Sequence, residues 1–134
     1  MARLSTDEFV AAAEFRSALR SFQRVAEQAA RRAGLTPQRH LLLLMIRGAS
    51  DRSGSSTVTE LAGRLQLAQS TVTELVRRAE AVGLIEREGS ASDGRVVHLR
   101  VSPEGEERLS RTIRELQNER EHLQSAVRNL RGVT

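Results

Sequence analysis

Two helical patterns separated by a very short turn, and followed by two strand patterns, occupy residues 57–101. Apolar side chains stand at positions 58, 61, 62 and 65, which is the spacing of one helix face. Thr57 and Glu60 form a T-x-x-E capping box at the start of this helix. The helical spacing returns at positions 72, 75, 76, 79 and 82 until Gly83. A second helix is therefore predicted over about residues 68–82.

The segment after Gly83 predicts a β-hairpin. Residues 85–88 and 96–101 are two short strand-like runs, and a turn-rich stretch at 89–94 separates them. Few architectures place a helix, a tight turn, a helix and a hairpin within 45 residues. The fold class predicted is mainly α with a small β-hairpin, in the form of a winged helix-turn-helix with its wing at about 85–101.

Amphipathic helices are predicted on both sides of this module. Apolar residues recur at helical spacing from Phe15 to Ala33, and Gly34 is the expected stop. Thr36-Pro37 starts a second helix that ends at Gly48, and Ser102-Pro103-Glu104 starts the last one. We expect one compact domain with three parts: an N-terminal dimerisation helix (1–35), a DNA-binding module (36–102) and a C-terminal dimerisation helix (103–134).

Composition excludes several classes of function. The chain has 134 residues and no cysteine, so thiol chemistry, disulfides and cysteine-bound zinc are ruled out. Its three histidines are too far apart in sequence for a local metal motif, and no phosphate-cradling glycine loop or nucleophilic serine elbow occurs. We expect no enzymatic activity, no metal and no cofactor.

Hydrophobicity and charge indicate where such a chain works. The longest apolar run is the six residues 41–46, which is too short for a membrane helix, and Thr6-Asp7-Glu8 interrupts the place of a signal peptide. A cytoplasmic protein without a membrane partner is expected. The net charge is +4, and all 21 basic residues are arginine, which permits an anionic partner without demonstrating one.

Short polar side chains gather at the start of the predicted second helix. In a helix-turn-helix this end lies in the major groove, where such side chains contact bases or phosphates. The alternative is that they are ordinary capping and solvated residues. Arg77 and Arg78 lie farther along and can reach the flanking phosphates. The candidate contacts at the helix start are Gln69, Ser70, Thr71 and Thr73.

The predicted wing carries a second set of DNA candidates. Arg95 is expected to enter the minor groove, and Asp93 can hold its guanidinium group in position. Arg100 adds a positive charge on the return strand. The alternative is that Asp93-Gly94 is only a turn and Arg95 a solvated residue.

The first and last helices carry apolar stripes larger than one small module can cover. We therefore expect a homodimer, with these stripes as its interface. The alternative is that the two terminal helices pack against each other within one chain. The predicted interface residues are Phe15, Leu19, Phe22, Leu109, Ile113, Leu116, Leu123, Val127 and Leu130.

A small-molecule site is a further hypothesis. The natural crevice lies between the dimerising helices and the module, and Phe22, Arg39 and His40 are its candidate lining. The alternative for His40 is a satisfied or half-exposed helix residue.

The chain resembles the MarR family of bacterial transcriptional regulators over essentially its whole length. The resemblance rests on LTPQRHLLLLMIRG, TVTELAGRLQLAQSTVTELVRRAEAVGLIERE, SDGRVVHLRVS and SPEGEERL. It implies an obligate homodimer whose two winged modules read a pseudo-palindromic operator in double-stranded DNA. It also implies release by a small aromatic or anionic organic effector, and a role as repressor.

Two features depart from the family pattern. Glu74 stands where a basic residue is frequent, and Arg77 stands where an acidic one is frequent. Residues 57–102 hold six arginines and six acids, so the charge of the module sums to zero. These features leave open the alternative of a winged helix that binds proteins and has little affinity for DNA.

Overall fold

The computed structural model describes residues 2–88 and 96–132 of the chain. It confirms a mainly helical fold with a small antiparallel sheet. The elements in chain order are α1 (Thr6–Arg32), α2 (Pro37–Arg47), β1 (Ser55–Ser56), α3 (Val58–Leu65), α4 (Gln69–Ala81), β2 (Ile85–Glu88), β3 (His98–Val101), α5 (Pro103–Glu115) and α6 (Gln117–Gly132).

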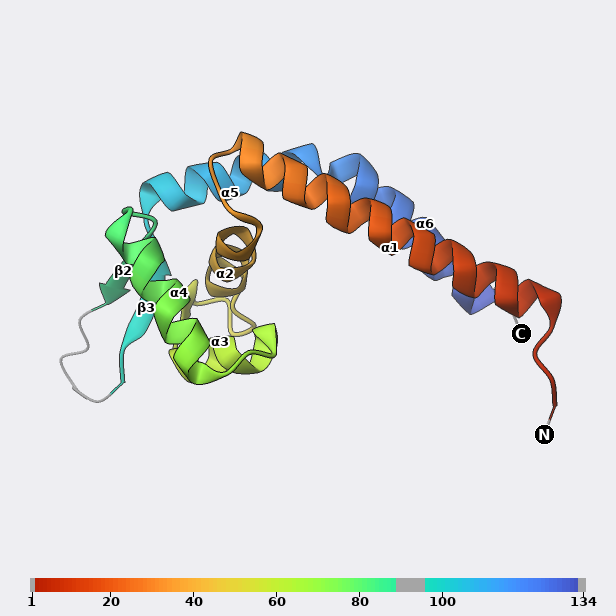
Figure 1. The fold of residues 1–134 in the computed structure, drawn as a ribbon, viewed down its shortest axis with the longest axis horizontal. Helices are drawn as coiled ribbons and strands as arrows, with labels where there is room; N and C mark the ends of the chain where they lie inside the picture. Colours follow the sequence, from red (N-terminus) through yellow and green to blue (C-terminus); the bar gives the residue numbers. More distant parts are fainter. Residues whose placement is uncertain (1, 89–95, 133–134) are drawn as a thin grey trace.

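The molecule has two visibly different parts (Figure 1). Helices α2, α3 and α4 surround one another beside the sheet and form the winged module with it, and α5 packs against this module. Helices α1 and α6 lie side by side and extend away from this module as a two-helix arm. Both chain ends lie at the far end of the arm, distant from α4.

Capping residues set the helix starts where the sequence predicts them. The Thr36 side chain caps α2, and Thr57 and Glu60 form the reciprocal capping box of α3. Helix α1 begins earlier than the apolar stripe from Phe15 suggested. Its first residue is Thr6, because Ser5 and Glu8 form another capping box.

The sheet has three strands, where the sequence predicted a two-stranded hairpin. Strand β1 pairs with β3, which gives the order β1-β3-β2, and Ser55 lies opposite Arg100. All strand pairs are antiparallel. The prediction missed β1 because two serines at the end of a turn-rich stretch carry no apolar alternation that marks a strand.

The prediction of a single C-terminal helix is wrong in detail, because the helix breaks at Leu116. Helix α5 ends there, and the Leu116 N–H bonds to the carbonyl of Ile113, three residues back. One turn earlier, the Thr112 hydroxyl bonds to the Arg108 carbonyl at 3.0 Å, a contact that bends helices. The break allows α5 to pack on the module while α6 packs along α1.

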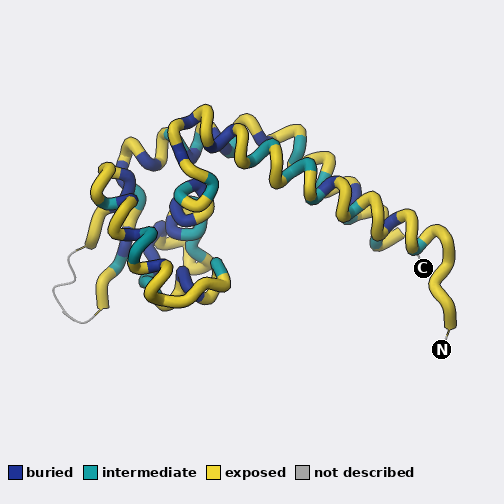
Figure 2. The backbone as a smooth tube through the Cα atoms, in the orientation of Figure 1, coloured by how far each residue is buried: buried dark blue, intermediate teal, exposed yellow. Residues whose placement is uncertain are grey.

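One hydrophobic core fills the module, whereas the arm is mostly exposed (Figure 2). Three residues of the leucine-rich run in α2 are fully buried, which the run of apolar side chains predicts: Leu42, Leu43 and Ile46. Val72, Val76 and Ala79 of α4 are also fully buried or nearly so. Burial of these side chains fixes which face of α4 points outward.

The start of α5 is joined to the turn that follows α4. The Ser102 hydroxyl donates to the Gly83 carbonyl at 2.6 Å and accepts from the Gly105 N–H at 3.0 Å. The Ser102 N–H donates to the Leu84 carbonyl at 2.9 Å. Gly105 lies so close that a Cβ atom there would be 2.5 Å from the Leu84 carbonyl oxygen. The backbone of the module and the backbone of α5 are therefore in direct contact.

We expect Gly105→Ala to destabilise the fold by about 1–3 kcal/mol, because the new methyl group overlaps the Leu84 backbone. Gly63→Ala in α3 is the matched control. A Cβ atom at Gly63 meets nothing within 4 Å, so this change should stabilise by about 0.5–1 kcal/mol. Urea unfolding of both variants measures the difference. Equal stability of the two variants would contradict the close packing at Gly105.

Candidate nucleic-acid interface

The first turn of α4 is open to solvent. Its N-cap residue is Ala68, whose side chain makes no capping hydrogen bond. By contrast, Ser or Thr side chains cap α1, α2, α3 and α5. The first N–H groups of α4 are therefore free of a side-chain cap, and such groups bind anions well.

The predicted base-reading residues lie on the exposed side of α4. Gln69, Ser70, Thr71 and Thr73 are all exposed, whereas Val72 between them is fully buried. The arrangement brings the four polar side chains together on one open helix end.

Arg77 and Arg78 are engaged by one acidic residue of the same helix. Arg77 donates to both carboxylate oxygens of Glu74, at 2.9 and 2.6 Å, and Arg78 donates to one of them at 3.0 Å. The hydrogen bonds from Arg77, and then those from Arg78, lower the pKa of Glu74 to about 2. Glu74 is therefore ionised at neutral pH, and the three side chains carry a net charge of +1.

The arginines of the sheet are also paired. Arg100 on β3 donates to Glu88 on β2, and this hydrogen bond lowers the pKa of Glu88. Arg87 makes two hydrogen bonds of 2.9 Å to Glu80 of α4. The predicted wing residues Asp93 and Arg95 lie outside the described residues.

The helix spacing shows which of these groups share a face. Ser70, Glu74 and Arg77 are separated by four and three residues, so they follow one another along the same side of α4. Arg78 lies one turn from Glu74 and joins this side through their hydrogen bond. We call Glu74, Arg77 and Arg78 the α4 charge cluster. In the sequence, Glu74 stands out as a departure from a pattern, and its spacing of three and four residues to the two arginines is also a signal of ion pairing.

The three candidate ligand residues lie on two helices and in different surroundings. Phe22 lines a hollow on the arm with Leu123 and Val127. Arg39 is half-buried on α2, and His40 is buried there. The His40 Nδ1 atom has no hydrogen-bond partner among the described residues, and burial lowers the His40 pKa.

His40 should make stability depend on pH. Its neutral form is favoured in the folded state, whereas the unfolded chain takes up a proton near pH 6.5. Stability is therefore highest above this pH and falls as the pH drops toward the lowered folded-state pKa. We expect His40→Leu to reduce the loss of stability between about pH 7 and pH 5. His122→Gln, at an exposed position, is the control. Thermal unfolding across this range measures both, and an unchanged pH profile in His40→Leu would exclude His40 as the cause.

The predicted dimerisation residues divide into two groups. Leu109 and Leu116 are buried within the same chain, and Leu109 belongs to the module core together with the adjoining Ile113. The others lie on the arm, where α1 and α6 pack against each other as the alternative prediction stated. They remain only partly buried there: Phe15, Leu19, Phe22, Leu123, Val127 and Leu130.

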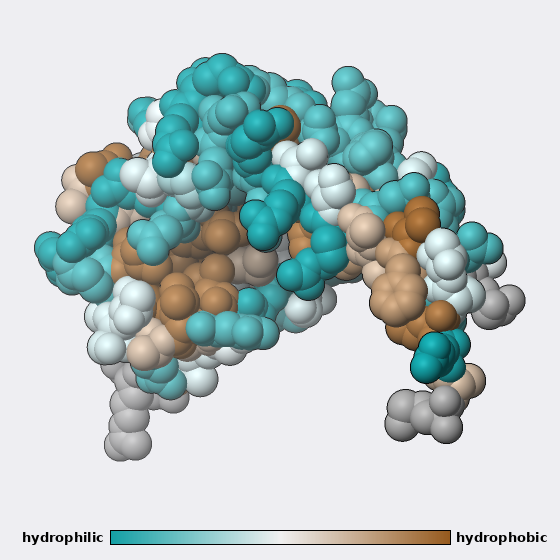
Figure 3. Space-filling model, turned by 45° about the vertical axis from the view of Figure 1, so that its right-hand side comes forward, coloured by the Kyte–Doolittle hydropathy of each residue, from teal (hydrophilic) through white to brown (hydrophobic). Residues whose placement is uncertain are grey.

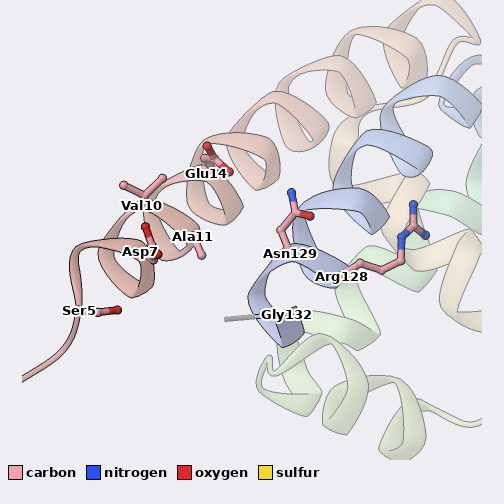
Figure 4. A pocket seen from close by; sticks show the side chains of 8 residues that line it. All are labelled: Ser5, Asp7, Val10, Ala11, Glu14, Arg128, Asn129 and Gly132. Carbon is pink, nitrogen blue, oxygen red and sulfur yellow. The ribbon is translucent and has the colours of Figure 1, made fainter. Parts of the chain in front are cut away.

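The arm presents apolar surface and open hollows. Phe9 and Val10 near its far end are 61% and 49% exposed. Figure 3 shows apolar side chains on the surface of the arm and a further group on the module beside it. A hollow at the far end lies between the start of α1 and the end of α6, with Ala11 and Asn129 on its two sides (Figure 4). The arm therefore has a face that its own chain leaves incompletely covered.

Neither a metal nor a membrane segment is indicated in the part of the chain that the structure describes. No group of three His, Asp or Glu side chains within residues 2–88 and 96–132 is arranged to hold a metal ion. No helix within the same residues is long and apolar enough to cross a membrane.

This arrangement of helices and sheet is a winged helix-turn-helix, and comparison with known proteins identifies its family. Residues 33–96 match the model of the MarR family. The uncharacterized HTH-type transcriptional regulator YsmB of Bacillus subtilis is 40% identical over 60 residues, which is 45% of this chain and 41% of YsmB. The match therefore spans less than half of that relative.

Solved structures extend the similarity to most of the chain. The transcriptional regulator Tm0710 from Thermotoga maritima is 30% identical, with 82% of this chain and 75% of Tm0710 covered and a TM-score of 0.65. A mutant MarR of E. coli complexed with operator DNA has the same fold, with 19% identity, a TM-score of 0.65 and coverage of 81% and 75%. The chain belongs to the MarR family.

Proposed function

We propose that this chain is a DNA-binding transcriptional regulator that places α4 in the major groove of duplex DNA. The observation that carries this proposal is the exposed, uncapped start of α4, where four polar side chains stand next to two arginines. Polar side chains there reach base edges, and free N–H groups donate hydrogen bonds to a phosphate oxygen. The E. coli MarR structure in complex with operator DNA supports the same function.

The remaining DNA contacts belong to the same proposal. Arg77 and Arg78 contact phosphates beside the major groove, after exchanging the Glu74 carboxylate for a phosphate oxygen. Arg95 enters the minor groove with Asp93 beside it, and Arg100 contributes from β3. Residues 36–102 then act as the DNA-binding module, and the terminal helices act in dimerisation.

The partly covered arm supports a homodimer. Helices α1 and α6 project beyond the module, and their apolar side chains are left half-buried or exposed by their own chain. Burying such a face against a second copy removes it from water. A two-fold dimer presents two α4 helices to successive major grooves, roughly 34 Å apart, and so selects a pseudo-palindromic operator. Repression, relieved by a small organic effector, is the regulatory role that we propose.

Selection of genomic fragments by the purified protein, followed by sequencing, tests this function. We expect an enriched pseudo-palindrome with half-sites about one helical turn apart. Replacing Ser70 and Thr71 together with Ala should weaken binding to that sequence by about 1–3 kcal/mol without changing the fold. Ser17→Ala, at an exposed position on α1, is the control.

Either of two results would count against the DNA-binding function. A folded wild-type protein that enriches no fragment even at low salt would favour the protein-binding alternative. The zero net charge of residues 57–102 is the sequence feature that favours this alternative. If the Ser70 and Thr71 double variant binds the selected sequence with full affinity, the start of α4 does not contact DNA.

Leu123→Arg should break the dimer, because it places a charge beside the half-buried apolar side chains of Phe22 and Val127 and adds to the arginines already around them. Leu123 suits this test better than Leu116, because Leu116 is buried within its own chain and its replacement would disturb the fold. His122→Arg adds the same charge at an exposed neighbouring position and should leave the dimer intact. Sedimentation velocity measures the mass of each variant. A Leu123→Arg protein that sediments as the wild type does would contradict an interface at this position.

A further inference from the structure

Glu74 lies in the middle of the face that α4 presents to DNA in the proposed function, on which this inference rests. Ser70 precedes it by one turn, and Arg77 and Arg78 follow it by one turn. Its carboxylate accepts three hydrogen bonds from the two guanidinium groups. We propose that Glu74 is a specificity-determining residue that suppresses binding to DNA of unmatched sequence.

The Glu74 carboxylate competes with DNA phosphates for Arg77 and Arg78. In free protein the Glu74 carboxylate occupies both Nε atoms and one Nη2 atom of Arg77 and Arg78. Arg77 meets it through two parallel hydrogen bonds, which is the geometry that a phosphate also offers to arginine. A phosphate must therefore displace an internal anion that already fits. Non-specific binding depends almost entirely on phosphate contacts, so this competition weakens it most.

The position of the negative charge of Glu74 has a second effect on DNA binding. When α4 lies in the groove, the Glu74 carboxylate is carried toward the same duplex as Ser70. Phosphates repel it, and in the major groove only the amino groups of cytosine and adenine can donate a hydrogen bond to it. Sequences that place such a group at this point offset the repulsion. With all other sequences, the Glu74 carboxylate loses water and gains no hydrogen-bond donor, which raises the free energy of the complex.

A contribution to helix stability explains the α4 charge cluster less well than a role in DNA binding does. All three side chains are between 43% and 66% exposed, and ion pairs at this exposure contribute little to stability. Arg87 with Glu80 is a comparable pair on the same helix, yet it joins α4 to β2 and holds two elements together. Among the described residues, the α4 charge cluster joins no second element. Its carboxylate therefore affects mainly what approaches the open face of α4.

The test is the binding of Glu74→Gln to two DNA duplexes across a range of salt concentrations. One duplex has a random sequence, and the other is the sequence that the wild-type protein selects from genomic fragments. We expect Glu74→Gln to bind the random duplex about three- to tenfold more tightly at low salt. The slope of log K against log salt should become more negative by about 1 for each arginine that gains a phosphate. The preference for the selected sequence should fall.

Two further variants separate this mechanism from a general effect of charge. Glu80→Gln changes the net charge by the same amount on the same helix but lies on a different side, and it should leave random-duplex binding nearly unchanged. Adding Arg77→Gln and Arg78→Gln to Glu74→Gln should abolish the gain, because the released arginines are its cause. Circular dichroism confirms that every variant keeps the helical fold.

The outcomes are distinct. If the wild type selects a sequence and Glu74→Gln binds random DNA no more tightly, or if Glu80→Gln gives the same gain, the role of Glu74 is overturned and the DNA-binding function stands. If Glu74→Gln loses the selected sequence without gaining random DNA, Glu74 only contacts a base or positions the arginines, and the suppression is overturned. If neither protein binds any duplex at low salt, the DNA-binding function fails and the inference fails with it.

Discussion

The contact between the start of α5 and the turn after α4 determines how the two parts of the molecule are placed. Ser102 bonds to the carbonyls of Gly83 and Leu84 with its hydroxyl and its backbone N–H, while also capping α5. A single residue thus ends the sheet, starts the helix that leads to the arm, and fixes the C-terminal end of α4. The bulk of any side chain at Gly105 would separate these backbones. The start of α5 and the turn after α4 are therefore held together through hydrogen-bonded backbone.

The open end of α4 follows from that placement. Its apolar residues pack into the module core, and the bonds to Ser102 hold the turn at its C-terminal end, so its N-terminal turn is the part left facing solvent. An alanine at the N-cap leaves the first N–H groups without a side-chain partner, although four other helices of the chain have one. An incomplete cap costs helix stability but leaves donors for an external anion.

Most helix boundaries could be predicted because they depend on local chemistry. The Thr36 cap, the Thr57 and Glu60 box and the left-handed Gly83 are all encoded within a few residues. The Ser5 and Glu8 box has an equally local signal, which the emphasis on the apolar stripe overlooked. The break at Leu116 is accompanied by a local bond from Thr112 to Arg108, but these residue types are not by themselves a signal for a break. The β1 strand could not be predicted in this way, because it depends on pairing with β3, which is distant in sequence. For the same reason, the stripe through Leu109 did not reveal that this residue belongs to the module core.

The exposure of the polar residues at the start of α4 could be predicted from the sequence, whereas the pairing of the arginines around them could not. Within residues 57–102, the arginines that the structure describes all have partners in the same chain: Arg64 bonds to carbonyls of α2 and its cap, and the other four bond to glutamates. A sequence count of charges gives zero for the module without showing that the five arginines described there are already occupied. Binding of a polyanion to these arginines must therefore proceed by exchange of partners. Since exposed ion pairs are weak, the exchange is feasible, and its free energy depends on how well the phosphate geometry replaces each carboxylate. DNA affinity in this module is consequently set by the arrangement of acids around the arginines more than by the number of arginines.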